Sequence, residues 1–322
     1  MNNTSNRPQT ILVLTSSSTG NNVFCTPAIR LLRKYLPHAM IDVVALNKLS
    51  AEVFEGSLDI NKLYVLEGAR KFDKLAKNYE KVICLNTNAL KKVRGTQTKM
   101  EVIPNYVNGI ARAEQQLGFM AQWLGVAVTD KDRKYVIGSG KPEDFSGLDK
   151  HHVQANDVLV SLHLGCGTTL LHGWKFFYKG RAEDERLWSI ERYIALGQAL
   201  IQENPNIRII ITGTKNESFL AKQFEKNVPG TINLVGKTSV KNIFDFMHEV
   251  SLFVAHDCGI FHVASATEVP IVGLYGATDS ILAGPFPVRP QHHIIEAKSM
   301  ADISVDQVVQ AAVLLLKNYP KK

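Results

Sequence analysis

The chain has 322 residues, enough for two domains with sizeable cores, so a peptide-scale or disulfide-stapled fold is excluded. Hydrophobic residues make up 45% and charged residues 21%, which is typical of a globular protein rather than a fibrous or disordered one. The 37 Lys and Arg residues outnumber the 30 Asp and Glu residues, so the surface is expected to attract anions such as phosphates, nucleic acid or acidic lipid heads.

The cysteines and the apolar runs limit the cellular setting. Cys25, Cys84, Cys166 and Cys258 lie far apart with no CxxC pair, which argues against a zinc site and a secreted disulfide framework. No apolar run approaches the roughly 18 residues that a membrane helix needs, and residues 11–14 are too short for a signal peptide. We therefore expect a cytoplasmic protein with reduced thiols.

Along the first part of the chain, short apolar runs alternate with amphipathic segments. Strands are predicted at residues 11–14, 41–46, 62–66 and 81–85, and helices at 27–35, 50–55, 72–78 and 111–124. A Ser/Gly loop is expected before the helix at 27–35. This alternation predicts a parallel, doubly wound sheet.

Residues 129–157 are rich in charges, Gly, Pro and His, as is typical of an interdomain connection, so we expect domains at 1–150 and 151–304. Beyond it, strands are predicted at 158–162, 207–212, 232–234, 252–255 and 271–275, and helices at 189–204, 217–226, 240–249, 260–267 and 305–317. The fold class is therefore α/β with two Rossmann-like halves. Ligands of such sheets bind outside the carboxyl ends of the strands, here expected between the halves.

Residues 254–266 carry the strongest local signal. A predicted strand ends on Asp257, Gly259 allows close backbone approach, and a helix then begins with free N–H groups, a pattern typical of phosphate binding. Two alternatives stay open at this point: Asp257 as a simple helix N-cap, and His262 as a hydrogen-bonded core histidine.

Two further strand ends carry weaker signals. Residues 162–169 enter a Gly-rich loop, which can wrap a diphosphate with backbone amides but lacks the full dinucleotide and P-loop patterns. Residues 273–279 lead into a turn of small and hydroxyl residues. An ordinary turn remains an alternative for both.

In their order along the chain, these segments resemble the heptosyltransferase family, glycosyltransferase family 9, whose bacterial enzymes move a heptose from ADP-heptose onto lipopolysaccharide core sugars. The family's DxGxxHxA, GxTD and (K)xWxxER(F/Y) signatures stand here as Asp257, Gly259, His262 and Ala264; Gly276, Thr278 and Asp279; and Arg186, Trp188, Glu191, Arg192 and Tyr193. Its Gly loop, GxxxE turn, LxGKTS turn and GDxxxxTP loop stand at residues 165–168, 213–217, 234–239 and 20–27.

The resemblance implies a GT-B fold, with two parallel sheets facing a central cleft, the donor held by the second half and the acceptor by the first. It also implies inversion at the anomeric carbon without a metal or cofactor. The implied donor-binding residues are Gly165, Gly167, Thr168, Thr169, Arg186, Thr214, Glu217, Gly236, Lys237, Asp257, Cys258, Gly259 and His262. The implied acceptor-side loop contains Gly20, Asn22 and Thr26.

The resemblance also bears on partners and on the last helix. It implies a nucleotide-sugar donor and a glycan or glycolipid acceptor, with peripheral contact at the cytoplasmic face of the inner membrane. Nucleic acid is not expected, because no recognised binding module is present. Residues 305–322 are expected to pack back on the first domain through an apolar stripe. Asp130-Lys131-Asp132 superficially resembles a DxD metal motif, but we interpret it as solvated surface.

Two positions depart from the family pattern. The family's acceptor loop has an Asp general base where this sequence has Asn21, and losing a general base typically removes roughly 10²- to 10⁴-fold in rate. Arg186 replaces the donor-phosphate Lys and keeps its charge.

Residues 173–184 form an extra basic, aromatic stretch that could cover the donor, touch anionic lipid or be a variable loop. Two hypotheses follow: an active transferase whose base has moved or is dispensable, and a nucleotide-sugar-binding protein that has lost catalysis.

Overall fold

The computed structural model describes residues 10–166, 185–276 and 278–321, and the chain divides into two compact units, Met1–Lys141 and Pro142–Lys322. The division falls a few residues before the expected boundary at 150. The reason is that this connection is tied to the second unit. The N–H of Glu143 donates to Oδ1 of Asp245 at 2.9 Å, and the ring of Phe145 lies 5.3 Å from that of Phe246.

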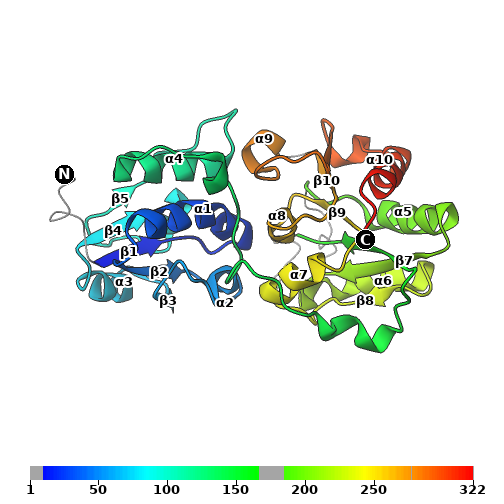
Figure 1. The fold of residues 1–322 in the computed structure, drawn as a ribbon, viewed down its shortest axis with the longest axis horizontal. Coiled ribbons are helices and arrows are strands. Elements are labelled where there is room, and N and C mark those ends of the chain that lie inside the picture. Colours follow the sequence, from blue (N-terminus) through cyan, green and yellow to red (C-terminus); the bar gives the residue numbers. More distant parts are fainter. Residues whose placement is uncertain (1–9, 167–184, 277, 322) are drawn as a thin grey trace. The chain divides into compact units, whose positions relative to one another are not determined.

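The first unit is built on a five-stranded parallel sheet in the order β3-β2-β1-β4-β5 (Figure 1). Its elements are β1 (Thr10–Leu14), α1 (Thr19–Tyr35), β2 (Met40–Ala45), α2 (Lys48–Ala51), β3 (Lys62–Val65), α3 (Ala69–Ala76), β4 (Lys81–Cys84), β5 (Glu101–Val102) and α4 (Arg112–Leu124). Leu12 and Leu14 of β1 are fully buried and pack in one cluster with Phe72 of α3. Ile11 and Val13, which point to the other face of β1, are fully buried as well, so this central strand is covered on both sides, as its continuous apolar sequence requires.

Helix α1 begins at Thr19, so the prediction of a loop over residues 20–26 and a helix from 27 is wrong. A proline in a helix normally leaves the carbonyl four residues earlier without its N–H donor. Here the Thr26 hydroxyl donates to the carbonyl of Val23 at 2.8 Å and fills the position that Pro27 leaves open. The Thr-Pro pair is thereby accommodated inside the helix.

The second unit has a six-stranded parallel sheet in the order β11-β10-β9-β6-β7-β8. Its elements are β6 (Val158–His163), α5 (Ile190–Glu203), β7 (Ile207–Thr212), α6 (Ser218–Asn227), β8 (Ile232–Asn233), α7 (Val240–Met247), β9 (Leu252–His256), α8 (Gly259–Ser265), β10 (Ile271–Tyr275), α9 (Ser280–Ala283), β11 (His292–Glu296) and α10 (Val305–Asn318). Ser189 caps the start of α5, because its side chain accepts from the N–H of Arg192. Both units have the predicted α/β, Rossmann-like architecture.

Helix α10 packs within the second unit, so the expectation that its apolar stripe covers the first domain is wrong. Val308, Ala311, Ala312 and Leu315 are buried in the cluster that contains Val160 of β6 and the apolar side chains of α5. The stripe therefore completes the core formed by the second sheet, beside α5, and needs no other partner (Figure 1).

The strand order reverses once in each unit, between β1 and β4 and between β6 and β9. Loops leaving the carboxyl ends of strands diverge at such a switch point, which creates the usual ligand position of a doubly wound sheet. Within the described ranges, no helix combines the length and the apolar character that crossing a membrane requires.

Candidate functional site

The site of the second unit is assembled at the switch point between β6 and β9. His163 of β6 lies in register with Ala255 of β9, so the two strands end side by side. Gly165 and Cys166 follow β6, while Asp257 follows β9 and leads directly into α8. Two of the three segments singled out from the sequence therefore meet at this edge of the sheet.

Asp257 lies at the centre of a small charged cluster. Nε2 of His262 is 3.6 Å from Oδ1 of Asp257, and the side chain of Thr278 donates a hydrogen bond to the same carboxylate. Burial raises the pKa of Asp257, but His262, Arg186 and Thr278 together hold it below its ordinary value. Asp257 is therefore a carboxylate at neutral pH despite being largely buried.

The geometry decides between the open alternatives for this segment. The N-cap of α8 is Cys258, not Asp257, so capping does not explain the carboxylate. His262 is only 2% exposed, yet its ring nitrogen faces Asp257 instead of a purely apolar core. Burial raises the pKa of the Cys258 thiol, which therefore stays neutral beside the cluster.

Glu217 connects the loops after β6 and β7. A Cβ atom at Gly165 would overlap Oε1 of Glu217, and one at Gly213 would lie 2.7 Å from Oε2, so both glycines are required by this carboxylate. Glu217 accepts a hydrogen bond from the N–H of Thr214. Burial of the side chain, which is 3% exposed, raises its pKa from 4.5 to about 7.

Gly236 and Lys237 lie after the edge strand β8, at the far end of the row of strand ends. Gly236 has φ +72° and donates its N–H to the carbonyl of Gly213 at 2.8 Å. Nζ of Lys237 donates to the carbonyl of Asn233 at 2.7 Å. Three strand spacings separate β8 from β9, roughly 14 Å, so the structure does not bring these two residues to Asp257.

In the first unit, the predicted acceptor-side residues occupy the first two turns of α1, beside the β1/β4 switch point. Asn22 is fully buried and accepts from the N–H of Ser16 at 2.7 Å while donating to the carbonyl of Ser50 at 2.8 Å. The Thr26 hydroxyl accepts from the N–H of Val136 at 3.1 Å. Both side chains therefore hold the framework.

Asn21 has a different environment. Its side chain is half-buried in the first turn of α1, and its Nδ2 lies 3.5 Å from Oγ of Ser16, a weak hydrogen bond. Gly20, the residue before it, is buried. Asn21 therefore differs from Asn22, because the protein holds its side-chain amide only weakly.

Known proteins add a family to this geometry. Residues 174–311 match the sequence model of "Glycosyltransferase family 9 (heptosyltransferase)". The chain is 29% identical over 154 residues to lipooligosaccharide heptosyltransferase 2 of Haemophilus ducreyi, covering 40% of this chain and 43% of that protein. It is 26% identical over 103 residues to the lipopolysaccharide core heptosyltransferase OpsX of Haemophilus influenzae, covering 32% and 30%. It thus matches less than half the length of these curated relatives.

The matched segment contains the Asp257 cluster. These residues, less than half of the chain, are the part that is similar to glycosyltransferase family 9 in sequence. The fold is similar over nearly the whole chain to that of a family 9 glycosyl transferase from Veillonella parvula, with a TM-score of 0.76, 18% identity and coverage of 96% and 97%. The E. coli heptosyltransferase WaaC with ADP gives a TM-score of 0.67 at 15% identity, with coverage of 95% and 99%. The predicted resemblance to this family and the predicted fold class are confirmed.

Trp188 and Arg192 of the family's (K)xWxxER(F/Y) signature hydrogen-bond to the backbone of residues 300–303. Nε1 of Trp188 donates to the carbonyl of Ile303 at 3.0 Å, and the guanidinium of Arg192 donates to the carbonyls of Met300 and Ala301 at 2.9 and 2.7 Å. Arg186, at the start of the signature, instead acts on Asp257 electrostatically, and its Nη2 lies 3.5 Å from Sγ of Cys166.

The family's GxTD turn also divides into different roles. A Cβ atom at Gly276 would overlap the backbone of Ser299 and Met300, so glycine is required there. Asp279 caps α9 by accepting from the N–H groups of Ile281 and Leu282 at 2.8 and 3.1 Å. Thr278 alone reaches Asp257.

Sequence reasoning missed a buried polar layer next to the Asp257 cluster. Nδ1 of His163 lies 2.9 Å from Oγ1 of Thr212, and Nδ1 of His256 lies 3.0 Å from the hydroxyl of Tyr193. Burial, reinforced by His256, lowers the pKa of His163 to about 3, so this ring is neutral. The signal was present in the sequence: His163, Thr212 and His256 are the polar last residues of largely apolar strands.

Other predicted positions carry no site geometry. Gly167, Thr168, Thr169 and residues 173–184 lie outside the described residues. In the DxD-like stretch, Asp132 is 8% exposed and pairs with Lys34 at 2.7 Å, while the exposed Asp130 pairs with Arg133. Asp132 is therefore a structural residue, not the solvated one expected. Among the residues that the structure describes, no cluster of three or more His, Cys, Asp or Glu side chains could hold a metal ion.

Proposed function

We propose that the chain is an inverting, metal-independent glycosyltransferase that moves a heptose from ADP-heptose to a lipopolysaccharide core or related glycan acceptor. The observation that carries the proposal is the ionised Asp257 at the switch point of the second sheet. It is contacted by His262 and Thr278 and electrostatically coupled to Arg186, and all four residues lie in the segment that matches the family 9 model. The heptose in this proposal is inferred from the names of the relatives, and the ADP is inferred from the WaaC structure, which was obtained with ADP.

The second unit supplies what a departing nucleoside diphosphate requires. A metal-independent transferase has to offset the charge of the leaving group with fixed cations and backbone amides. In the proposal, Arg186 is that cation, and Asp257 restrains it by charge attraction. The N–H groups that begin α8 add further donors, although a helix of seven residues contributes only a modest dipole.

The first unit would orient the acceptor. Asn21 can hydrogen-bond an acceptor hydroxyl, but a neutral amide cannot take its proton. This position supports the second candidate, a nucleotide-sugar-binding protein without catalysis. A change at Asn21 should affect turnover and leave donor binding unchanged, because the donor residues Asp257, His262 and Arg186 all lie in the second unit.

Donor binding tests the proposal directly. Calorimetry of the full chain against ADP-, UDP- and GDP-sugars should select ADP-heptose. Asp257→Ala should weaken that binding by about 1–3 kcal/mol through loss of a charged hydrogen-bonding group. Asp306→Ala, which removes an exposed carboxylate from the first turn of α10, is the matched control and should bind as the wild type. Unchanged affinity in a folded Asp257→Ala protein would contradict the assigned role.

Metal independence has its own measurement. Transfer and donor binding should both persist in EDTA, because the proposal gives the leaving-group charge to Arg186 and backbone amides. Loss of either in EDTA, with recovery on adding Mg²⁺ or Mn²⁺, would contradict this part of the proposal.

A further inference from the structure

Tyr193 of α5 connects the two segments that carry the charged groups of the second-unit site. It follows Arg186 closely in the chain and is fully buried. Its hydroxyl lies 3.0 Å from Nδ1 of His256, the last residue of β9, and Asp257 comes directly after that strand. One side chain therefore joins the segment that carries Arg186 to the strand that ends next to Asp257.

The direction of this hydrogen bond follows from the proton of the hydroxyl. Burial raises the pKa of Tyr193 well above its ordinary value, so the hydroxyl keeps its proton at neutral pH. Its oxygen accepts from the backbone N–H of His256, and among the described residues Nδ1 of the same residue is the acceptor for the hydroxyl proton. Nδ1 is therefore unprotonated, and the proton of the neutral ring is on Nε2.

His256 lies where β9 loses one of its two neighbouring strands. The register with β10 includes His256, whereas the register with β6 ends one residue earlier, at Ala255. The sheet therefore holds the last residue of β9 on one side only, and the hydrogen bond with Tyr193 adds a second restraint. Because Asp257 follows directly, this restraint limits the movement of its backbone.

The ring of Tyr193 is also held on the side of Arg186. It packs edge-on against the ring of Trp188, with the ring centroids 5.0 Å apart and the planes at 84°. Trp188 lies two residues after Arg186, and its Nε1 donates to the carbonyl of Ile303. Trp188, Tyr193 and His256 are at most 1% exposed, so this set of contacts has little space in which to rearrange.

The polar layer around His256 holds geometry without adding charge. His163, the last residue of the neighbouring strand β6, has a pKa lowered to about 3 by burial and by His256, so its ring is neutral. Its Nδ1 lies 2.9 Å from Oγ1 of Thr212. Neither imidazole therefore offsets the negative charge of Asp257, and the layer acts on this carboxylate through its position.

We propose that Tyr193 is a positioning residue, whose hydroxyl fixes the separation of Arg186 and Asp257 through His256. Charged groups whose separation is fixed in advance need no reorganisation when a diphosphate binds. The proposal rests on the proposed function for the identity of the ligand. The separation itself can be measured without a ligand, so the two proposals can fail independently.

The pKa of Asp257 reports its interaction with Arg186 in the free protein. His262, Arg186 and Thr278 hold this pKa below its ordinary value. Tyr193→Phe keeps the ring and removes the hydroxyl, and the family signature accepts either residue at this position, so the variant should fold. NMR titration of the carboxyl carbon of Asp257 should find a higher pKa in this variant than in the wild type. An unchanged pKa would overturn the proposal.

Donor calorimetry gives the second readout. Tyr193→Phe should bind ADP-heptose about three- to tenfold more weakly, the equivalent of one hydrogen bond. His256→Leu removes the acceptor and should weaken binding to a similar extent, and the double variant should lose no more, because the two groups act as one unit. His256→Asn retains an acceptor oxygen and should bind more tightly than His256→Leu. Losses that add in the double variant would contradict action through His256.

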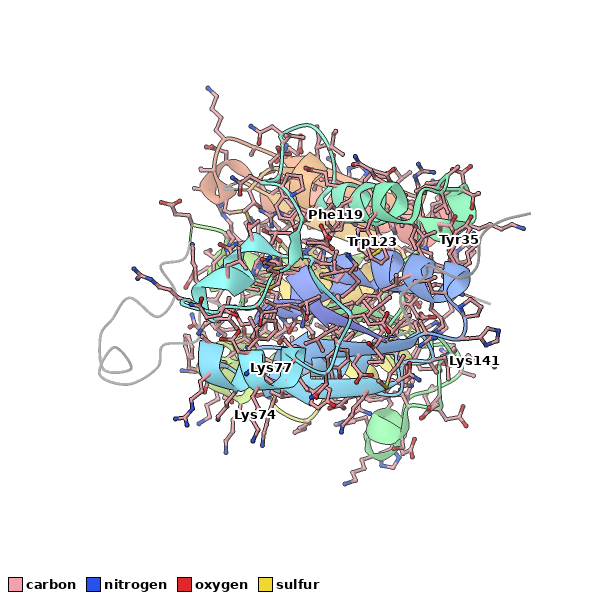
Figure 2. The ribbon with its side chains drawn as sticks, turned by 90° about the vertical axis from the view of Figure 1, so that its left-hand side faces the viewer. Tyr35, Lys74, Lys77, Phe119, Trp123 and Lys141 are labelled. Atoms are coloured by element: carbon pink, nitrogen blue, oxygen red, sulfur yellow. The ribbon has the colours of Figure 1, made fainter. Side chains whose placement is uncertain are left out.

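Two tyrosines of the first unit provide matched controls. Tyr79→Phe removes a hydroxyl that donates to Oδ2 of Asp42 at 2.5 Å, and Tyr35→Phe removes the hydroxyl of the last residue of α1 (Figure 2). Neither variant should change donor affinity or the pKa of Asp257, even where Tyr79→Phe lowers the unfolding temperature as much as Tyr193→Phe does.

The controls separate positioning from a general loss of stability. If Tyr79→Phe raises the pKa of Asp257 as much as Tyr193→Phe does, the effect follows stability and the proposal is overturned. If the pKa rises in Tyr193→Phe alone while no form of the protein binds a nucleotide-sugar, the positioning role is supported and the proposed function is contradicted.

Discussion

The two units use the same framework and present opposite chemistry at their switch points. The β6/β9 switch point of the second unit carries ionised and titratable side chains, namely Asp257, His262, Arg186 and Glu217. The β1/β4 switch point of the first carries hydroxyls and amides, with Ser16 and Asn21 bonded to each other. Yet the first unit is the basic one, with its charge gathered on exposed side chains between residues 70 and 99.

This difference shows that net charge and site chemistry are separate properties of a doubly wound unit. Strand ends decide which groups a ligand meets, while helix surfaces decide which large partners the unit attracts. The second unit is nearly neutral in total and still binds an anion in our proposal, because a few fixed groups are concentrated at one edge.

The largest effect is expected from placing a carboxylate at position 21, where the family has an Asp and this chain has Asn21. Asn21→Asp should raise turnover by roughly 10- to 10⁴-fold with the right acceptor, because a general base typically contributes up to that amount. Donor affinity should not change, since Asn21 belongs to the other unit. Steady-state kinetics and donor calorimetry of the same preparation measure the two quantities.

Asn21→Ala serves as the control and should not gain activity. If Asn21→Asp is no faster than the wild type, the base lies elsewhere or is not limiting. If every form binds donor but transfers to no acceptor, the binding-protein candidate is favoured.

Helix α10 offers a test confined to the second unit. Leu315 is 3% exposed within the core, so Leu315→Ala should lower the free energy of unfolding by about 2–5 kcal/mol. Leu314 is 48% exposed on the same helix, and Leu314→Ala should change stability by no more than about 0.5 kcal/mol. Hydrogen exchange resolved by unit should show lost protection in the second unit only. Lost protection across the first sheet as well would contradict the packing described here.

Glu217 should make the stability of the second unit depend on pH. Its pKa is raised on folding from 4.5 to about 7, so its stabilising contribution is complete below 4.5 and is lost as the pH rises to about 7. Over this interval, the wild type should lose about 3 kcal/mol more than Glu217→Gln. Hydrogen exchange of the α6 amides at several pH values measures the difference. Parallel pH profiles for the two proteins would show that Glu217 does not titrate as described.

The smallest effect is expected from removing the hydrogen bond between Trp188 and the carbonyl of Ile303. Trp188→Phe keeps the buried ring contact with Tyr193 but removes the hydrogen bond to Ile303, which should cost about 1–2 kcal/mol of stability. Because Arg186 lies two residues away, donor affinity should fall as well, and calorimetry alongside thermal unfolding would detect both changes. A loss of stability with unchanged donor affinity would indicate that Trp188 serves the core alone.

The sequence predicted the strands and the second-unit site well, because their signals are local. Apolar runs of β-branched residues located nearly every strand, and the residues around Asp257 form the expected cluster. The short edge strands β5 and β11 were missed. The first has only two residues, and the second, His292–Glu296, has just two apolar residues among its five. Short, mixed segments of this kind depend on pairing with a neighbour that is distant in sequence.

Tertiary contacts decided the remaining errors. Pro27 suggested a helix start, but the Thr26 hydroxyl allows the helix to begin eight residues earlier. The apolar stripe of α10 predicted a buried face without identifying its partner. Lys237 matched a motif, yet its ammonium group binds the carbonyl of Asn233, which no spacing rule reveals.

The turn at residues 299–303 gives two of the three partners of Asp257, Thr278 and Arg186, a common anchor. Gly276 packs against its backbone and is followed two residues later by Thr278, while Trp188 and Arg192 donate to its carbonyls and are preceded by Arg186. A substitution in that turn therefore shifts both partners together, and neither can be adjusted alone from this side. Natural variation at residues 299–303 should change how strongly the protein holds its ligand more readily than which ligand it selects.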